Sequence, residues 1–366
     1  MHFQCSLSDL LPAVNLVEKA VASQNDIPIL TGIHIASDTS SVSLTATNLE
    51  LGIKSEFKAY VNTADKTVVD GKLLAALVRK LPDQPIIFEV VDQQLLITAG
   101  NVEFTLNIFN NEEDFPQLPE AEQVMFSLPA NKLLRMIKNT IYACGKDEHR
   151  PFLNGILFEI IDNRLSFVAT DINRLAYYAV ELNSDVPNME ILVPMKTMQE
   201  LQRSLPNDDT PINIAFSDKS LIFEYGPNKI TTRLIEEQFP KYRGLFPDEE
   251  PIRITANRQM LIAAVERAAL INTDEGSQIV IFEAVDGVLE ISTPSSSKGK
   301  SQEKLNVEHQ GENGKAAFSA KYILDMLKAT DAEQVLFHFN ADLRQCLMQA
   351  DNDEDQKYIL MPIRLS

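Results

Sequence analysis

Three pairs of basic residues have the same internal spacing and recur at nearly equal intervals along the chain. The pairs are Lys72 with Arg79, Lys196 with Arg203, and Lys321 with Lys328. Each second cation follows the first by seven residues, which is two turns of a helix, so both side chains would share one helix face. Their chemistry is electrostatic rather than catalytic. Such a face is either simply solvated or retained for a function, and the pattern alone leaves both interpretations open.

Motifs of enzymatic or metal-binding chemistry are absent from the sequence. It contains no HExxH, GxSxG, P-loop or GxGxxG motif. The histidines are scattered: His2, His34, His149, His309 and His338. Asp147, Glu148 and His149 adjoin, but a solvated loop explains them better than an active site does. We therefore expect no metal and no cofactor, and keep an enzyme as the main alternative class.

The cation pairs lie in segments that are predicted to be helices: residues 71–83, 194–208 and 319–333. In the first segment Leu73, Leu74, Leu77 and Leu81 predict an apolar face. A different helix pattern also recurs, at residues 7–21, 129–143 and 256–270. Short segments rich in β-branched residues, such as "GIHIAS", "RLSFVAT" and "GVLEIST", predict strands between the helices.

Other landmarks repeat with the helices. "ATN" at residues 46–48 matches "ATD" at 169–171 and "STP" at 292–294, with both shifts equal to 123 residues. "FP" at 115–116 matches "FP" at 239–240 and "MP" at 361–362. A threefold internal repeat follows. We predict three α+β domains, residues 1–122, 123–250 and 251–366, each with two helices packed on antiparallel sheets.

The bulk composition fits a globular protein of several domains. The chain has 366 residues, of which 45% are apolar, and a formal net charge of -19. The sum of charges argues only weakly against nucleic acid, because the distribution of charge decides such binding. Cys5, Cys144 and Cys346 are widely spaced and predict reduced thiols. We see no signal peptide and no membrane span, which leaves the cytoplasm as the expected location.

Several longer motifs resemble one family. They are "IPIL" at 27–30, "RPFLNGILFE" at 150–159, "ATDINRLA" at 169–176, "QFPKYRGLFP" at 238–247 and "YILMPIRL" at 358–365. In this order, and with the threefold repeat, they resemble the bacterial sliding clamp, the beta subunit of DNA polymerase III. The resemblance covers the whole chain.

The resemblance implies a ring of two chains joined head to tail, with the helices lining a hole that holds duplex DNA. The six cations would then face phosphates without reading sequence. It also implies a hydrophobic groove for QLxLF-type peptides of the replicative polymerase, the clamp loader and repair proteins. The implied groove residues are Leu153, Thr170, Ile172, Asn173, Arg174, Leu175, Pro240, Leu245, Tyr322, Leu343, Gln345, Ile359, Leu360, Met361, Pro362, Ile363, Arg364 and Leu365.

By position, Leu270 and Ile271 should meet Ile108 and Phe109 of a second copy, although ordinary core packing would also explain these four residues. A core edge strand would likewise explain part of the C-terminal motif. The interpretation is therefore a non-enzymatic homodimeric processivity factor without affinity for membranes.

The sequence departs from the family's usual pattern at several positions: Gln24, Asp147, Glu148, Ile172, Asn173, Glu237 and Lys241. Acidic residues at 147 and 148 would repel phosphate. The departures keep two further alternatives open, a divergent second clamp of its cell and a ring that binds only proteins.

Overall fold

The computed structural model describes residues 1–23, 27–120, 123–217, 219–246, 251–271, 278–294, 299–339, 344–351 and 353–364. The chain divides into two compact units. Unit 1 is Met1–Lys132 with Arg203–Leu234, and unit 2 is Leu133–Gln202 with Ile235–Ser366. The domain boundaries predicted at residues 122 and 250 fall on residues outside the described ranges, and they stay predictions.

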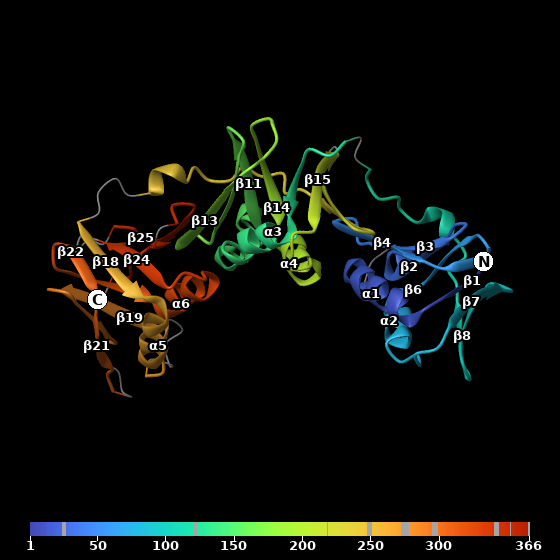
Figure 1. Ribbon diagram of the computed structural model, residues 1–366, viewed down its shortest axis with the longest axis horizontal. Helices are drawn as coiled ribbons and strands as arrows, with labels where there is room; N and C mark the ends of the chain where they lie inside the picture. The colour runs from blue at the N-terminus through green and yellow to red at the C-terminus, as the bar shows by residue number, and fades with distance from the viewer. Residues whose placement is uncertain are drawn as a thin grey trace. The chain divides into compact units, whose positions relative to one another are not determined.

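Unit 1 holds two antiparallel sheets (Figure 1). The smaller has the order β5 (Tyr60–Thr63), β1 (His2–Cys5), β7 (Ile86–Val91), β8 (Gln94–Ala99) and β9 (Val102–Asn107). The larger has the order β10 (Phe126–Pro129), β15 (Pro211–Ser217), β16 (Ser220–Tyr225), β17 (Asn228–Arg233), β4 (Leu51–Lys58), β3 (Ser41–Thr47), β2 (Gly32–Ser37) and β6 (Lys66–Asp70). Strands β4 and β17 come from the first and second predicted repeats, so their pairing joins the repeats in one sheet.

Unit 2 is built in the same way. Its larger sheet has the order β14 (Met189–Pro194), β11 (Gly155–Ile161), β12 (Arg164–Thr170), β13 (Arg174–Glu181), β26 (Gln356–Leu360), β25 (Cys346–Ala350), β24 (Gln334–Phe339), β18 (Ile252–Asn257) and β22 (Glu308–Gly311). Its smaller sheet has the order β21 (Gln302–Asn306), β20 (Val288–Ser292), β19 (Ile279–Val285) and β23 (Gly314–Ser319). Here β13 pairs with β26, which joins the second and third repeats.

The described residues contain six α-helices, two for each predicted repeat: α1 (Leu7–Val17), α2 (Gly71–Val78), α3 (Ala130–Lys138), α4 (Met195–Ser204), α5 (Arg258–Ala269) and α6 (Ala320–Ala329). Side chains that favour helix starts cap several of them. Ser6 accepts from the Asp9 amide at 3.1 Å, and Asp70 accepts from the Leu73 amide at 2.7 Å. The prediction of an α+β fold with antiparallel sheets and two helices in each repeat is confirmed.

Helix α2 differs from its prediction in two respects. It ends at Val78, so Arg79 is the residue that follows the helix rather than part of it. Leu73 is also exposed, whereas Leu74, Ala75 and Val78 are buried. The buried face of the helix is therefore formed by Leu74, Ala75 and Val78, and Leu73 does not belong to it.

Each unit has an aromatic core. In unit 1 the rings of Phe3 and Phe88 stack at 4.7 Å between centroids. In unit 2 Phe282, Phe318 and Phe337 meet with centroids 5.3 to 5.8 Å apart. All five rings are almost fully buried, and each adds a large apolar side chain to the core beneath these sheets.

Candidate functional site

The "ATD" motif forms a tight corner between β12 and β13. The Thr170 hydroxyl accepts from the Ile172 amide at 3.1 Å, and it donates to the Arg174 carbonyl at 2.7 Å. Asp171 accepts from the amides of Asn173 and Arg174, both at 3.1 Å. Ile172 has a φ of 82°, a conformation that costs a β-branched residue free energy, and its side chain is 53% exposed. The corner thus presents an aliphatic side chain to solvent.

The buried side chain of Arg174 holds this corner in place. Its side chain is 5% exposed. Its guanidinium donates to Asp171 at 2.9 Å, to Asp325 of α6 at 2.6 Å, and to the Tyr142 carbonyl. It also lies 4.2 Å from the centroid of the Tyr322 ring. The buried cation is therefore fully partnered, and it ties the corner to α6.

The C-terminal motif runs along the same corner. Strand β26 pairs with β13 so that Leu360 is opposite Arg174. Beyond the strand, the Met361 amide donates to the Asn173 carbonyl at 2.9 Å, and the Ile363 amide donates to the Ala317 carbonyl of β23 at 2.7 Å. Two backbone contacts hold the segment after β26 in an extended path, where the Met361 side chain is 42% exposed.

The residues assigned to the groove fall into three groups. Buried ones are Leu153, Thr170, Arg174, Leu175, Ile359 and Leu360. Half-buried ones are Tyr322, Gln345, Pro362 and Ile363. Exposed ones are Ile172, Asn173, Pro240, Leu245, Met361 and Arg364. Leu343 and Leu365 lie outside the described residues. The buried group forms a base beneath the exposed apolar side chains, and Leu175 and Ile359 belong to one core cluster with Phe239, Tyr242 and Leu347.

A hollow of about 330 Å³ opens beside Pro240. A charged residue among those lining it, Glu159 of β11, was not predicted from the sequence and is almost completely buried. Glu159 accepts from the Tyr242 hydroxyl and from the Arg243 guanidinium, both at 2.5 Å. Burial, and then the contact with Glu159, raise the pKa of Tyr242. The "FPKYRGL" segment is thereby fixed against the sheet by an ionic contact.

The six repeated cations are all exposed, as predicted. Arg203 is not without a partner, and three others pair with acids within their own unit. Arg79 pairs with Glu18, Lys321 with Asp325 at 2.6 Å, and Lys328 with Glu266 at 2.7 Å.

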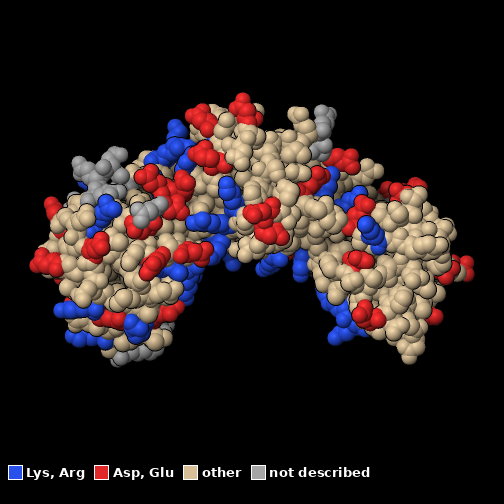
Figure 2. All heavy atoms as spheres, viewed as in Figure 1, with Lys and Arg blue, Asp and Glu red and all other residues tan. Residues whose placement is uncertain are grey.

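Lys72 and Lys196 differ from those three cations, because no carboxylate of the described residues lies within 4.0 Å of either. Figure 2 shows Lys and Arg side chains gathered beside α1 and α2 of unit 1, while Asp and Glu are spread widely. The acidic net charge therefore does not exclude a local basic surface.

The loop at Asp147 and Glu148 is less negative than its sequence indicates. Arg150 donates to Asp147 through two nitrogens, at 2.8 and 2.5 Å. The contact with Arg150, and then the His149 amide, hold the pKa of Asp147 below its usual range. The positive charge of Arg150 offsets part of the charge of this ionised carboxylate, so the loop should repel phosphate less than the sequence indicates. Of the other departures, Glu237 and Lys241 are exposed and Gln24 lies outside the described residues.

The residues assigned to an interface between copies are accessible to different degrees. Leu270 follows α5 and is 73% exposed, and Ile271 is half-buried. In unit 1, the Phe109 amide donates to the Val68 carbonyl at 2.9 Å, and Ile108 forms a bridge with Val69. Both side chains are half-buried. A single exposed aliphatic side chain is common on protein surfaces, so the assignment of these four residues to an interface stays a prediction.

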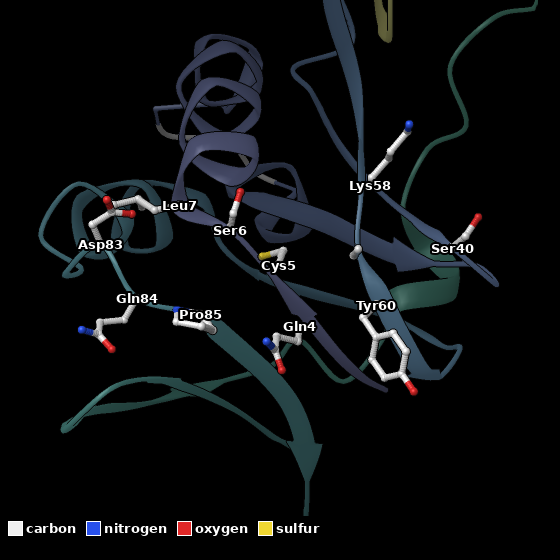
Figure 3. A pocket seen from close by; sticks show the side chains of 11 residues that line it. Gln4, Cys5, Ser6, Leu7, Ser40, Lys58, Tyr60, Asp83, Gln84 and Pro85 are labelled. Atoms are coloured by element: carbon white, nitrogen blue, oxygen red, sulfur yellow. The ribbon is translucent and has the colours of Figure 1, made fainter.

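A larger hollow, of about 680 Å³, lies in unit 1 and is lined by none of the residues that the sequence assigned to the groove, to DNA or to an interface (Figure 3). Gln4 and Cys5 of β1, Tyr60 of β5 and Pro85 contribute to its wall. Burial, and then Asp9, raise the pKa of the Cys5 thiol to about 12, so this thiol is a poor nucleophile at neutral pH.

The described ranges contain no candidate metal centre and no candidate membrane-spanning helix. His, Cys, Asp and Glu side chains nowhere gather there in a group of three or more that could hold a metal ion. No helix in these ranges is both long enough and apolar enough to cross a membrane.

Comparisons with known proteins agree along the whole chain. Three family models match in order: the N-terminal domain of the DNA polymerase III beta subunit at residues 1–119, its central domain at 127–241 and its C-terminal domain at 243–364. A beta sliding clamp of Staphylococcus epidermidis is 28% identical, with 100% of this chain and 99% of the relative covered.

Solved structures of sliding clamps also match this chain over its whole length. A DNA polymerase sliding clamp of Bacillus subtilis superposes with a TM-score of 0.96 at 27% identity, and both chains are covered completely. A sliding clamp of Pseudomonas aeruginosa bound to griselimycin superposes with a TM-score of 0.94 at 28% identity, again over all of both chains.

Proposed function

Since this chain belongs to the family of DNA polymerase III beta subunits, the sliding clamps, we propose that it closes around duplex DNA as a head-to-tail dimer and tethers partner proteins there through the groove at the 170–174 corner. Subunits of this family are non-catalytic processivity factors of the polymerase III holoenzyme.

The assignment of the groove rests mainly on the positions of Ile172 and Met361. Both are aliphatic, both are about half exposed, and the Asn173 carbonyl next to Ile172 accepts from the Met361 amide. Apolar side chains held on a rigid base are suited to one or two buried anchors of a short peptide. The Pseudomonas aeruginosa relative binds griselimycin, which supports a ligand surface on this fold. We therefore assign QLxLF-type peptides of the polymerase, the clamp loader and repair proteins as ligands.

The repeated cations support the DNA part of the proposal. They are exposed in all three repeats and lie on or directly after α2, α4 and α6. Contacts of lysine and arginine with phosphates do not depend on base sequence and weaken as salt rises. Such contacts permit sliding. Lys72 and Lys196 should contribute most, because binding phosphate breaks no ion pair of either residue.

A labelled QLxLF-type peptide, followed by fluorescence anisotropy, tests the groove. Ile172→Asn should weaken binding at least about fivefold, because asparagine keeps the positive φ but removes an aliphatic contact. Leu49→Asn is the matched control. Leu49 has a φ of 73° and is 52% exposed, in the equivalent corner of the first repeat. Equal affinity of both variants and the unchanged protein would overturn the assignment of the groove.

Retention on closed circular DNA after enzymatic loading tests the ring. Reversal of Lys72 and Lys196 to Glu should shorten retention, and the loss should grow at low salt. Reversal of Lys219, a cation outside the repeated pairs, serves as the control. Retention equal to that of the control would favour the alternative of a ring that binds only proteins. Sedimentation should give twice the 41.0 kDa of one chain, and Leu270→Asp should reduce it to the single chain.

A further inference from the structure

One carboxylate oxygen of α6 is shared between the groove and the cationic helix face. Asp325 Oδ2 accepts from Arg174 Nη1 at 2.6 Å and from Lys321 Nζ at 2.6 Å. Arg174 belongs to the corner that presents Ile172. Lys321 is one of the six repeated cations. All three side chains belong to unit 2, so the contact lies within one compact body.

The two cations differ in what else they can do. Arg174 is 5% exposed and also donates to Asp171 and to the Tyr142 carbonyl, so its guanidinium is held in place. Lys321 is 65% exposed and can swing toward another anion at little cost. Asp325 is 26% exposed and therefore feels both partners at reduced screening. Only the lysine side of this three-membered cluster is free to rearrange.

We propose that Asp325 is a positioning residue for the groove, and that its hold on Arg174 tightens when Lys321 leaves it for a DNA phosphate. This inference rests on the proposed function, since it takes Lys321 to face DNA and the corner to bind peptide. No role was predicted for Asp325 from the sequence.

The expected sign of the coupling between DNA and peptide follows because Arg174 and Lys321 donate to the same oxygen of Asp325. Two cations that donate to the same lone-pair region repel each other and each weakens the other's contact. Departure of Lys321 leaves the carboxylate to Arg174 alone, which stiffens the corner and lowers the cost of ordering it around a peptide. Binding of DNA should then strengthen binding of peptide. By linkage, peptide should strengthen binding of DNA by the same factor.

Peptide affinity, measured by anisotropy with and without a saturating short duplex at low salt, tests the inference. The unchanged protein should bind peptide about threefold more tightly with DNA present, the scale of one exposed ion pair. Lys321→Gln should bind peptide as tightly without DNA as the unchanged protein does with it, and DNA should add nothing further. Lys328→Gln is the matched control, because it removes a cation of the same helix that pairs with Glu266 instead.

Asp325→Asn separates this role from mere support of the fold. It should weaken peptide binding and abolish the effect of DNA, while thermal unfolding shows that the protein is folded. If Lys321→Gln and Lys328→Gln respond alike to DNA, or if DNA leaves the peptide affinity of the unchanged protein as it was, the inference is wrong. If the unchanged protein binds neither peptide nor DNA, the proposed function itself fails.

Discussion

Two corners of the molecule have the same backbone and different chemistry. Thr47–Leu51 joins β3 to β4 in unit 1, and Thr170–Arg174 joins β12 to β13 in unit 2. In the first corner the Leu49 amide donates to Thr47 at 3.0 Å, and Asn48 accepts from the Leu51 amide at 2.8 Å. The second corner makes the same contacts with Thr170 and Asp171. What differs is the ionic group: Leu51 and Asn48 are replaced by Arg174 and Asp171.

The two corners show which features belong to the repeated hairpin and which belong to the candidate site. Leu49 and Ile172 share a positive φ and an exposed aliphatic side chain, so exposure of Ile172 is not in itself a sign of a binding surface. The distinguishing features of the second corner are the buried Arg174, its link to α6, and the extended segment that follows β26. A site can thus arise from a repeated hairpin through very few substitutions.

The largest expected effect comes from giving the second corner the residue of the first. Arg174→Leu leaves Asp171 and Asp325 without their shared cation and should lower the free energy of unfolding by about 3 kcal/mol. Chemical denaturation measures this change. Adding Asp171→Asn, which completes the transplant, should recover part of the loss. A single variant as stable as the unchanged protein would show that the ionic cluster contributes nothing to the corner.

A smaller loss of stability is expected at Gly52, where β4 leaves the first corner and pairs with β17. Gly52 of β4 is opposite Thr231 of β17, and a Cβ at Gly52 would lie 2.4 Å from Leu118 Cδ2 and 2.6 Å from Thr231 Oγ1. Gly52→Ala should therefore cost about 2 kcal/mol in unfolding free energy. At the equivalent place in the second repeat Leu175 is opposite Ile359, and Leu175→Ile should be tolerated better. If Gly52→Ala is the milder change, the two strand pairs are not packed as described.

Replacing Asp171 by asparagine and Asn48 by aspartate should change the unfolding free energy by unequal amounts. Asp171→Asn weakens a contact of 2.9 Å with Arg174 and should cost about 1 kcal/mol. Asn48→Asp keeps both amide contacts and meets no buried cation, so the change should stay within about 0.5 kcal/mol. Thermal unfolding of both variants checks this asymmetry, and equal losses would contradict it.

The smallest effect concerns pH. His34 of β2 occupies the place of Leu157 in the second repeat, and its ring stacks on Phe115 at 5.2 Å. Burial, and then Lys66 and Lys54, lower the pKa of His34 below 6.5. The unfolded chain takes up a proton at higher pH than the folded one does. The contribution of His34 to stability is therefore complete above its unfolded pKa and is lost as the pH falls toward the folded one.

The unfolding temperature of the protein should then fall more than that of His34→Leu between about pH 7.5 and about pH 5.5. Carboxylates titrate alike in both proteins, so the difference isolates the histidine. Parallel curves for the two proteins would show that His34 is not a source of acid sensitivity.

The sequence predicted the regular parts of the fold because their signals are local. Helix patterns at 71–83 and 319–333 and the recurring "AT" motifs need only neighbouring residues to be recognised. Pairing of β4 with β17 and of β13 with β26 joins strands about 180 residues apart, and no local pattern encodes it.

The residues of the candidate site likewise differ in whether a local sequence pattern predicts them. The repeated cations were predicted as exposed because period and charge suffice for that. Asp325 was missed as a member of the site, although its spacing of four from Lys321 was a usable signal. Its contact with Arg174 depends on how two distant segments fold together, which no single stretch reveals. The position of Arg79 beyond the end of α2 likewise reflects a short helix that propensity alone does not delimit.

The pairing of strands across repeats also bears on how the chain can be divided. A fragment of residues 123–250 would keep β17 and β13 but lose their neighbours β4 and β26. Each of those strands would then present a row of unpaired amides and carbonyls along its length. Bare strand edges of this kind recruit other chains, so we expect the middle repeat to aggregate when it is expressed without both of its neighbours.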